Sequence, residues 1–557
     1  MLLFLLTSGA LLQASLTART GITFRTSDLE LQRLYNLAEA KAALNIVQFT
    51  PTMKVLVEGG GYGNAWIETQ PMGGEMYAKR NLEVALNNQL VFIHGQRADG
   101  RLPGMVISGE TARKEGMDQH PPEAMLWMPE AGIVADFEMF QGYCFPDPAW
   151  KMYFWTGKDR TYLAKLYRAL ERHDGYLWRT RDSNGDGLLE TWCVWDTGED
   201  SSTRFETRHV PMRWPSDLPP GGNPKVLAPI ASMDIMAYSY AGRATLARIA
   251  HELGNGREEY WRQQAEDVRQ RLMKGLWDPA RHACFDRDRT GKVMPELVHN
   301  NLRAMYFGVF NQEMADAFIK YHLLNPDEFW TPLPLPSIAV HEPLYRNIPG
   351  NNWSGQPQGL TYQRAIRALE NYSHFAEVSL LGDKFLKVLI RNGNKLVQQY
   401  DAISGKAAAQ TRDGYGPTIL AALEYISRMY GISLEVEQGQ VWWSGLNNAG
   451  PDFTYTQQWG DRLWKLSCER GQLTAYLNGS ELFSCTAGVR VVTDLEGRLR
   501  EVVGIDSVQR AIELRATGKR HELTVSPNQV YAIGAEGMKF LRKAPFDYPM
   551  LPGNGLK

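Results

Sequence analysis

The sequence predicts a mainly helical domain followed by a small β-rich domain. Residues 27–430 carry apolar residues at three- and four-residue spacing, in segments separated by Gly- and Pro-rich loops. Beyond Gly431 the pattern changes to short β-type runs punctuated by Gly and Asn. At 557 residues the chain also exceeds what one hydrophobic core usually supports, so we expect at least two domains.

The helical segments follow one another without intervening strands. Ser27 or Asp28 is the expected N-cap of the first one. Helices are predicted over residues 28–46, 160–172, 235–253, 258–276, 360–381 and 417–430. Consecutive helices of this kind pack on one another as a bundle, a solenoid or a toroid, and periodicity alone does not choose among the three.

Residues 431–557 form the second predicted domain. Its runs of β-type residues, at positions 441–443, 473–477, 489–492 and 512–514, are short and repeatedly interrupted. Several short strands bounded by turn residues are typical of a β-sandwich. We therefore expect a small sandwich to follow the helical domain.

Residues 1–26 form a separate N-terminal segment in this interpretation. The stretch from Leu2 to Leu16 is mostly apolar, but it is shorter than the ~20 residues that a membrane-spanning helix needs. It has the length of a cleaved export signal, which would place the protein in the periplasm or outside the cell, yet no Lys or Arg precedes Arg19. The alternative is a buried N-terminal segment of a cytoplasmic protein. No later segment predicts a membrane span.

The composition argues against several classes of partner. Lys and Arg total 60 against 62 Asp and Glu, a net charge of -2, so we expect no nucleic-acid partner. The five cysteines show neither CxxC nor zinc-like spacing, which argues against a disulfide framework and a cysteine metal site. The chain holds 16 Trp and 24 Tyr, and aromatic rings stack on the apolar faces of sugars.

Residues 181–204 form the loop with the densest functional chemistry. Four oxygen-bearing side chains recur in its first half: Asp182, Asn184, Asp186 and Glu190. Gly185 and Gly187 let such a loop curl so that its oxygens converge, which suits a structural Ca²⁺ ion. The pattern differs from an EF-hand because the distal Glu comes early. A metal-free cluster of Asx turns is the alternative.

The second half of this loop places three carboxylates beside aromatic rings and a cation. Asp196, Glu199 and Asp200 lie between Trp195 and Arg204. A carboxyl packed against a Trp ring tends to stay protonated and can donate to a leaving oxygen, whereas a neighbouring Arg keeps others ionised. Helix caps and surface ion pairs are the alternative interpretation.

Here the chain resembles the helical inverting glycosidases related to processing α-glucosidase I, mannosylglycerate hydrolase and, more distantly, trehalase. In those families a D-x-N-G-x-G-x-x-E loop precedes a stretch of the form S-G-x-D-x-S-P-R, which here falls on residues 197–204 with Thr203 in place of Pro. Residues 335–339 and 352–358 resemble the family's P-S-x-A and Y-W-R-G-P-x-W stretches, without the Arg and the second Trp. Residues 232–238 and 414–417 add weaker matches in the same order.

The resemblance implies an (α/α)6 toroid that hydrolyses oligosaccharides or small glycosides. It implies an inverting, exo-acting hydrolase of α-glucosides or related small glycosides, with Asp200 as the general acid. The residues expected to bind substrate are Trp195, Glu199, Arg204, Trp353, Gln356, Gln398 and Tyr400. Apart from the Ca²⁺ ion that the loop at residues 182–190 suits, no cofactor is expected.

One departure from the family pattern affects the mechanism. Inverting hydrolysis needs a second carboxyl group to activate water, and the resemblance places that group at residue 398, which is a Gln. An amide orients water but does not take up its proton near neutral pH. Three explanations stay open: another carboxylate acts as base, phosphate attacks directly, or the protein binds glycans without cleaving them.

The first two explanations each require particular residues. The carboxylates considered as replacement base are Glu75, Asp401, Glu68 and Asp413, of which the first two are the residues we assign beside Asp200. The basic residues considered for holding phosphate are Lys79, Arg80, Arg97 and Arg101. No phosphate-binding motif supports the second explanation.

Overall fold

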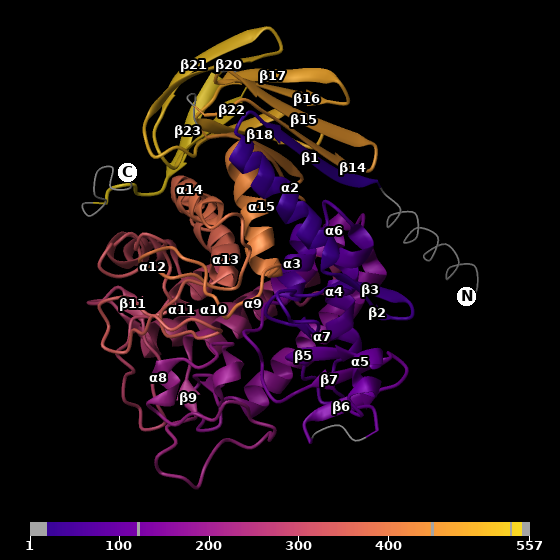
Figure 1. Ribbon diagram of the computed structural model, residues 1–557, viewed down its shortest axis with the longest axis vertical. Helices are drawn as coiled ribbons and strands as arrows, with labels where there is room; N and C mark the ends of the chain where they lie inside the picture. Colours follow the sequence, from indigo (N-terminus) through magenta and orange to yellow (C-terminus); the bar gives the residue numbers. More distant parts are fainter. Residues whose placement is uncertain (1–18, 120–122, 447–449, 535–536, 549–557) are drawn as a thin grey trace.

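The computed structural model describes residues 19–119, 123–446, 450–534 and 537–548. A ring of helices forms one part of the molecule and two antiparallel sheets cover one end of it, uppermost in Figure 1. The loops that connect the helices at the other end lie at the bottom of that view, around α8 (Thr203–Glu206) and β9 (Ile230–Ala231).

The inner helices of the ring are the most deeply buried. Each contacts the next in order and the last contacts the first, which closes the ring. They are α3 (Gln70–Tyr77), α6 (Pro146–Trp155), α9 (Met233–Leu253), α11 (Asn300–Tyr306), α13 (Gly359–Glu370) and α15 (Gly416–Tyr430). Helices α3, α6, α11 and α15 are buried along essentially their whole length, because they have neighbours on every side.

Outer helices alternate with the inner ones along the chain. They are α2 (Leu29–Leu44), α4 (Leu82–His94), α7 (Arg160–Thr180), α10 (Glu258–Gly275), α12 (Gln312–Phe318) and α14 (Phe375–Arg391). A π-helical turn, Ile319–Leu323, extends α12. Helix α10 shows the pattern of an outer helix, since it buries only one stripe of residues and exposes the rest. The alternation of inner and outer helices is that of an α/α toroid.

The predicted helices are present with one exception. Asp28 caps α2 by accepting from the backbone amides of Glu30 and Leu31. The single helix expected over residues 360–381 is instead two helices, α13 and α14, separated by a turn in which Ser373 has a φ of 62°. The prediction was wrong here because the apolar periodicity continues through the turn, where Tyr372 is buried.

Short elements connect the helices at the loop end. A four-stranded sheet in the order β4-β5-β7-β6 precedes α6. The remaining strands of this region form two-stranded pairs, and a short helix follows β5. Their bounds are β2 (Ile46–Thr50), β3 (Met53–Leu56), β4 (Ala65–Trp66), β5 (Met105–Ser108), α5 (Gly109–Lys114), β6 (Met125–Met128), β7 (Ile133–Asp136), β8 (Glu190–Thr191), β10 (Trp277–Asp278) and β11 (Ala283–Cys284).

The β-rich region begins directly after α15. Its seven-stranded sheet has the order β1-β14-β15-β16-β17-β20-β21 and its six-stranded sheet the order β12-β13-β18-β19-β22-β23. The strands are β12 (Gly431–Glu435), β13 (Gln440–Gly445), β14 (Phe453–Trp459), β15 (Arg462–Glu469), β16 (Gln472–Leu477), β17 (Ser480–Thr486), β18 (Val489–Asp494), β19 (Leu499–Gly504), β20 (Arg510–Ala516), β21 (Lys519–Val525), β22 (Gln529–Gly534) and β23 (Gly537–Lys543). All four predicted β-type runs lie in these strands.

The first strand of this region comes from the other end of the chain. β1 (Thr20–Thr26) pairs with β14 along its full length, from Thr20 opposite Trp459 to Thr26 opposite Phe453. The separate N-terminal segment expected over residues 1–26 therefore does not include these seven residues, which belong to the sheet. The apolar stretch before Arg19 lies outside the described residues.

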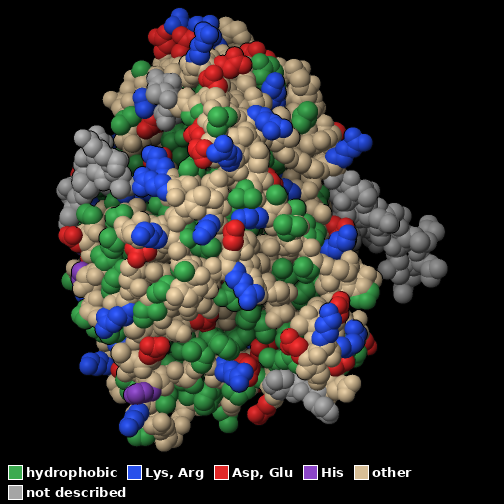
Figure 2. Space-filling view, in the orientation of Figure 1, with side chains coloured by type: hydrophobic (Ala, Val, Ile, Leu, Met, Phe, Trp, Pro, Cys, Tyr) green, Lys and Arg blue, Asp and Glu red, His purple; other side chains and the backbone are tan. Residues whose placement is uncertain are grey.

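The surface shows no segregation of charge on the face in Figure 2. Basic and acidic side chains are interspersed there with hydrophobic ones. Among the described residues, no helix is both long and apolar enough to cross a membrane.

Candidate active site

Asp200 lies in the loop between a 3₁₀ turn, Val194–Asp196, and helix α8 at the loop end of the ring. Its Oδ2 accepts a 2.6 Å hydrogen bond from Asn351 Nδ2, and its carbonyl accepts from the backbone N–H of Trp353 at 3.0 Å. Oδ1 is buried and has no protein partner. Burial raises the pKa of the Asp200 carboxyl to about 6, although hydrogen bonds from Asn351 and Trp195 oppose the rise. We call residues 194–206 the acid loop.

The acid loop is held in an unusual backbone conformation. Ser201, next to the acid, has a φ of 54°, in the left-handed region that residues other than Gly rarely adopt. Its carbonyl accepts hydrogen bonds from Asn352 Nδ2 at 2.9 Å and Ser354 Oγ at 3.1 Å. These contacts, supplied by the segment before α13, fix the direction in which Asp200 projects.

Two other carboxylates of the acid loop, Asp196 and Glu199, are paired with buried arginines. Arg204 Nη2 lies 2.6 Å from Glu199 Oε2, and its Nη1 lies 2.7 Å from Asp286 Oδ2. Arg181 pairs in the same way with Asp196 at 2.6 Å. The charge of Arg204 holds the pKa of Glu199 down at about 2. Glu199 therefore stays ionised, and Asp200 alone among the three carboxyls at residues 196–200 has no cationic partner in the structure.

A chain of hydrogen bonds leads from Asp200 to Gln398. Asn351 donates to Asp200, Gln398 Nε2 donates to Asn351 Oδ1 at 2.8 Å, and the hydroxyl of Tyr62 donates to Gln398 Oε1 at 3.0 Å. Tyr415 packs edge-on against Tyr62 with ring centroids 6.3 Å apart. Gln398 therefore lies across Asn351 from the acid, the place where the resemblance expects a base.

Two further carboxyls lie close enough to Asp200 for its charge to raise their pKa values. Burial is the largest cause for both, and the pKa is raised to about 8 for Glu58 and to about 7 for Glu68. Glu58 Oε1 accepts from the hydroxyl of Tyr415 at 3.0 Å. We call Glu58, Tyr62, Gln398 and Tyr415 together the tyrosine wall.

Glu68 packs against the acid loop itself. A Cβ atom added to Gly198 would lie 2.7 Å from Glu68 Oε1, and one added to Gly142 would lie 2.5 Å from the same oxygen. Arg364 Nη2 donates to this oxygen at 3.4 Å, and Gln141 Nε2 donates to Oε2 at 3.3 Å. The structure thus places Glu68 beside the acid, behind its loop.

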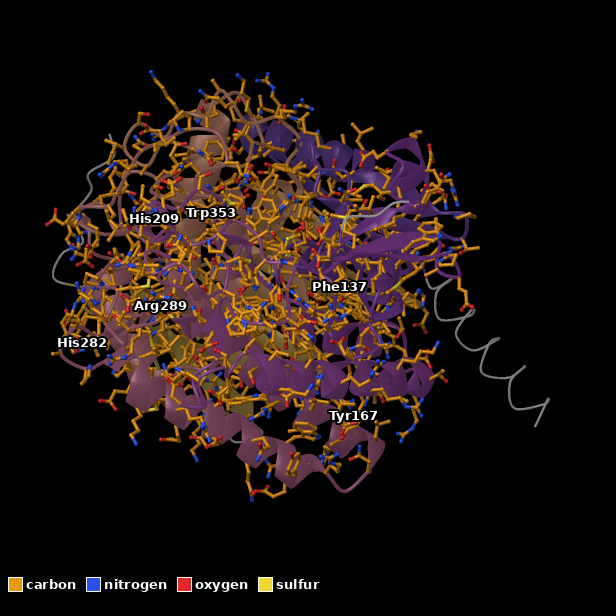
Figure 3. The ribbon with its side chains drawn as sticks, turned by 90° about the horizontal axis from the view of Figure 1, so that it is seen from below. Phe137, Tyr167, His209, His282, Arg289 and Trp353 are labelled. Carbon is orange, nitrogen blue, oxygen red and sulfur yellow. The ribbon has the colours of Figure 1, made fainter. Side chains whose placement is uncertain are left out.

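Most residues expected to bind substrate lie around this site. Trp353 is buried, with its ring centroid 5.4 Å from that of His299, and lies toward the middle of the ring when the loop end is viewed in Figure 3. Trp195 is partly exposed next to Asp200.

Two of the expected substrate-binding residues are instead part of the framework. The hydroxyl of Tyr400 donates to the carbonyl of Lys395 and accepts from the amide of Val397, so it closes its own loop. Gln356 is buried between Gln399 and Asn347 and bonds to both. These two predictions were wrong because the motif match fixes the position of a side chain in the sequence and not the direction in which it points.

The structure also corrects the prediction that Glu75 and Asp401 are replacement bases. Glu75 accepts from Trp155 Nε1 at 3.1 Å and lines a small cavity with Ser433 and Leu434 of β12, at the end of the ring that faces the sheets. Asp401 uses one oxygen to cap a turn at Ile403 and Ser404 and bonds with the other to Asn347. Neither carboxylate is brought to Asp200, because each is used in local structure.

The loop with the four predicted calcium ligands bonds to itself. Asp182 accepts from the amide of Gly187, Asn184 from that of Asp186, and Asp186 from that of Leu188. Glu190 is buried, and its carboxylate accepts from the side chains of Ser183 and Trp192. Within the described part of the chain, no three Asp, Glu, His or Cys side chains converge as a metal site.

The cations considered for phosphate are already paired. Lys79 pairs with Glu424, Arg80 with Glu39, and Arg97 with Asp99 and Asp217. Arg101 also contacts Asp217, at 3.4 Å. Asp413, the remaining carboxylate considered as base, pairs with Lys41 at 2.5 Å. None of these groups faces Asp200.

Three residues of the site were missed by the sequence analysis. Tyr62, Asn351 and Glu58 carry no motif of their own. A signal existed for two of them, since Glu58 and Tyr62 flank three consecutive glycines, all with positive φ. Such a run marks a backbone shape that only glycine adopts easily, and loops of that kind often carry function.

Comparisons with known proteins find matches to the helical part of the chain. A model of the mannosylglycerate hydrolase MGH1-like glycoside hydrolase domain matches residues 64–416. The GH63 mannosylglycerate hydrolase from Thermus thermophilus, solved in complex with glucose, is 18% identical with a TM-score of 0.55 over 70% of this chain and 99% of that one. No curated protein matches the chain.

Two other solved structures share the fold. Neutral trehalase Nth1 from Saccharomyces cerevisiae is 12% identical with a TM-score of 0.50, over 72% of this chain and 81% of that one. A sialidase is 15% identical with a TM-score of 0.60, over 85% of this chain and 41% of that one. These likenesses show the helical toroid fold. Because the matching domain covers more than half of the sequence and contains both Asp200 and Gln398, the chain belongs to the mannosylglycerate hydrolase MGH1-like glycoside hydrolase family.

Proposed function

We propose that the protein is an inverting, exo-acting glycoside hydrolase of α-glucosides or related small glycosides, with Asp200 as its general acid. The observation that carries this proposal is the contrast within the acid loop. Glu199 and Asp196 are neutralised by buried arginines, whereas Asp200 has none and has a pKa raised to about 6. A carboxyl that keeps its proton near neutral pH can donate it to a glycosidic oxygen.

The surroundings of Asp200 suit a sugar. The partly exposed Trp195 supplies aromatic surface, and Asn351, Gln398 and Tyr62 supply hydrogen-bonding groups. The solved mannosylglycerate hydrolase was obtained in complex with glucose, which supports a small glycoside as substrate. In the bound state a leaving oxygen would replace Asn351 as the partner of Asp200.

A second candidate function is glycan binding without hydrolysis. It is favoured by one observation, that residue 398 is an amide held by hydrogen bonds on both of its polar atoms. Direct attack by phosphate is not favoured, because Lys79, Arg80 and Arg97 are paired with carboxylates.

Release of sugar from a panel of α- and β-linked disaccharides and aryl glycosides tests the proposal. The native protein should release a sugar whose anomeric configuration, followed by NMR before mutarotation, is opposite to that of the substrate. Saturable sugar binding without release of sugar from any substrate would instead establish the second function. Retention of configuration would contradict the inverting mechanism.

We also propose that the two sheets of the β-rich region pack face to face as a β-sandwich. Contacts of β12 with β14 and β15 support this arrangement, since these strands belong to different sheets. Alternation of buried and exposed residues along β14 and β15 gives each strand one inward face.

A further inference from the structure

The Gln398 amide is fixed in an orientation that serves to hold water. Its Nε2 donates to Asn351, and its Oε1 accepts from Tyr62. One lone pair of Oε1 remains to accept a hydrogen bond from a water molecule. The amide does not become a proton acceptor near neutral pH, so a hydrolytic reaction at this site needs a carboxylate elsewhere.

Glu68 does not meet the geometric requirement for that carboxylate. In an inverting reaction the base lies on the opposite side of the sugar from the acid. Glu68 instead packs directly against Gly198 of the acid loop, so it lies on the acid's own side. Its oxygens accept hydrogen bonds from Arg364 and Gln141. Arg303 Nη2 also lies 3.9 Å from Oε1. A carboxylate held in this way suits the hydroxyl groups of a bound sugar.

Glu58 is the carboxyl of the tyrosine wall, which contacts Asn351 through Gln398. It follows β3 and precedes the three glycines that lead to Tyr62. The hydroxyl of Tyr415 donates to its carboxylate at 3.0 Å, and its carbonyl accepts from the amide of Gly416 at 2.6 Å. None of the ion pairs among the described residues includes Glu58. Its carboxylate is therefore free of a cation that would remove its basicity.

A small cavity adjoins Glu58. Its lining includes Glu58, Thr69, Gln70, Gln363 and Gly416, and its size is that of about one water molecule. A water placed there would lie against Glu58.

Resting on the proposed function, we infer that Glu58 is the general base and that Gln398 and Tyr62 position the attacking water for it. The water oxygen forms a bond to the anomeric carbon while the bond from that carbon to the leaving oxygen breaks. Asp200 gives its proton to the leaving oxygen, and the ionised Glu58 takes one proton from the water. Asp200 then regains a proton and Glu58 loses one, so the net reaction consumes one water molecule.

The charge environment agrees with this pair of roles. Burial raises the pKa of Glu58 to about 8, with further rises from Glu68 and Asp200, while the hydroxyls of Tyr415 and Thr69 lower it. The pKa of Asp200 is about 6. For a reaction that needs Glu58 ionised and Asp200 protonated, a plot of kcat/KM against pH is bell-shaped. Its two limbs lie near these two pKa values, whichever group titrates first.

The test uses the native protein, Glu58→Gln and Asp200→Asn with two aryl glycosides, one with a good and one with a poor leaving group. Removing a base lowers kcat/KM for both substrates, whereas removing the acid mainly affects the poor leaving group. We expect Glu58→Gln to lose about 10²-fold or more on both. Azide, an anion that needs no base, should restore the rate of Glu58→Gln and yield a glycosyl azide of inverted configuration.

Matched variants keep the result interpretable. Glu110→Gln removes an exposed carboxylate that pairs with Lys114 and should behave as the native protein. Glu58→Asp keeps the carboxylate, so it should retain more activity than Glu58→Gln at an unchanged melting temperature. In Glu58→Gln rescued by azide, the pH profile of the rate should keep only one limb, which falls as pH rises because Asp200 loses its proton.

Two results would overturn the assignment. The first is native activity in a folded Glu58→Gln. The second is a Glu68→Gln variant that loses kcat/KM equally on both substrates and recovers its rate with azide. Absence of activity in the native protein would contradict the proposed function itself, which separates that failure from failure of this inference.

Discussion

The acid loop and the tyrosine wall face each other across Asn351, and they control protons in different ways. In the acid loop Asp196 and Glu199 pair with arginines, whereas Asp200 has no cationic partner and its pKa is raised to about 6. The tyrosine wall contains no arginine. Its one carboxyl, Glu58, is bonded to hydroxyl groups and is shifted by burial.

The difference shows how one site can contain a carboxyl that stays ionised and carboxyls that gain and lose protons near neutral pH. Arg204 lowers the pKa of Glu199 more than burial raises it, whereas burial without a cation raises the pKa of Glu58. The two carboxyls to which we assign chemistry, Asp200 and Glu58, are separated from Glu199 by having no arginine partner. Four experiments test that separation.

The largest effect is expected for Asp200→Asn. The variant keeps the hydrogen-bonding shape and loses the proton donor, so kcat/KM on substrates with poor leaving groups should fall by roughly 10²–10⁴-fold. Steady-state kinetics on an alkyl and a dinitrophenyl glycoside measure the effect. A uniform loss on both substrates would indicate that Asp200 does not act as the acid.

A large loss of stability is expected for Arg204→Met. The variant leaves Glu199 and Asp286 buried without their cation, and breaking a buried pair by removing one partner costs about 3–5 kcal/mol. The free energy of unfolding, from denaturant titration, measures this cost. The control Arg33→Met removes an exposed pair with Glu30, worth about 1 kcal/mol or less. Equal stability of the two variants would contradict the structural role of Arg204.

Asn351→Ala should shift the pH dependence. The hydrogen bond from Asn351 stabilises the ionised form of Asp200 and so lowers its pKa. Without it the pKa rises above about 6, and Asp200 keeps its proton to a higher pH. The limb that reports Asp200 should then move to higher pH in a profile of kcat/KM. A shift to lower pH would show that the contact does not act on the ionised carboxyl.

The smallest effect concerns the loop at residues 182–190. If its side chains turn from backbone amides to a Ca²⁺ ion, a chelator should lower the melting temperature of the native protein by a few degrees, and Asp186→Ala should lose that sensitivity. The melting curve with and without chelator measures it. An unchanged curve of the native protein would support the alternative of a metal-free cluster of Asx turns, whose bonds the structure shows.

The sequence by itself determined most of the elements and pointed to Asp200 as the candidate acid. Helical periodicity, the cap at Asp28 and the β-type runs after Gly431 are local patterns. They can be recognised in the sequence because they do not depend on how the elements pack together. The order of the motifs likewise led to Asp200. It did not show the break between α13 and α14, because the apolar spacing continues through the turn, where Tyr372 is buried.

Only the tertiary structure decided which carboxyls face Asp200. Glu75 and Asp401 looked as suitable as Glu58 in the sequence, since all are acidic residues near glycines and aromatic rings. Closure of the ring brings residue 58 beside residue 415 and residue 62 beside residue 398, both far away in the sequence, and turns Glu75 toward the sheets. Proton affinity depends on burial and on charges brought in from distant segments, so no spacing along the chain could have fixed it.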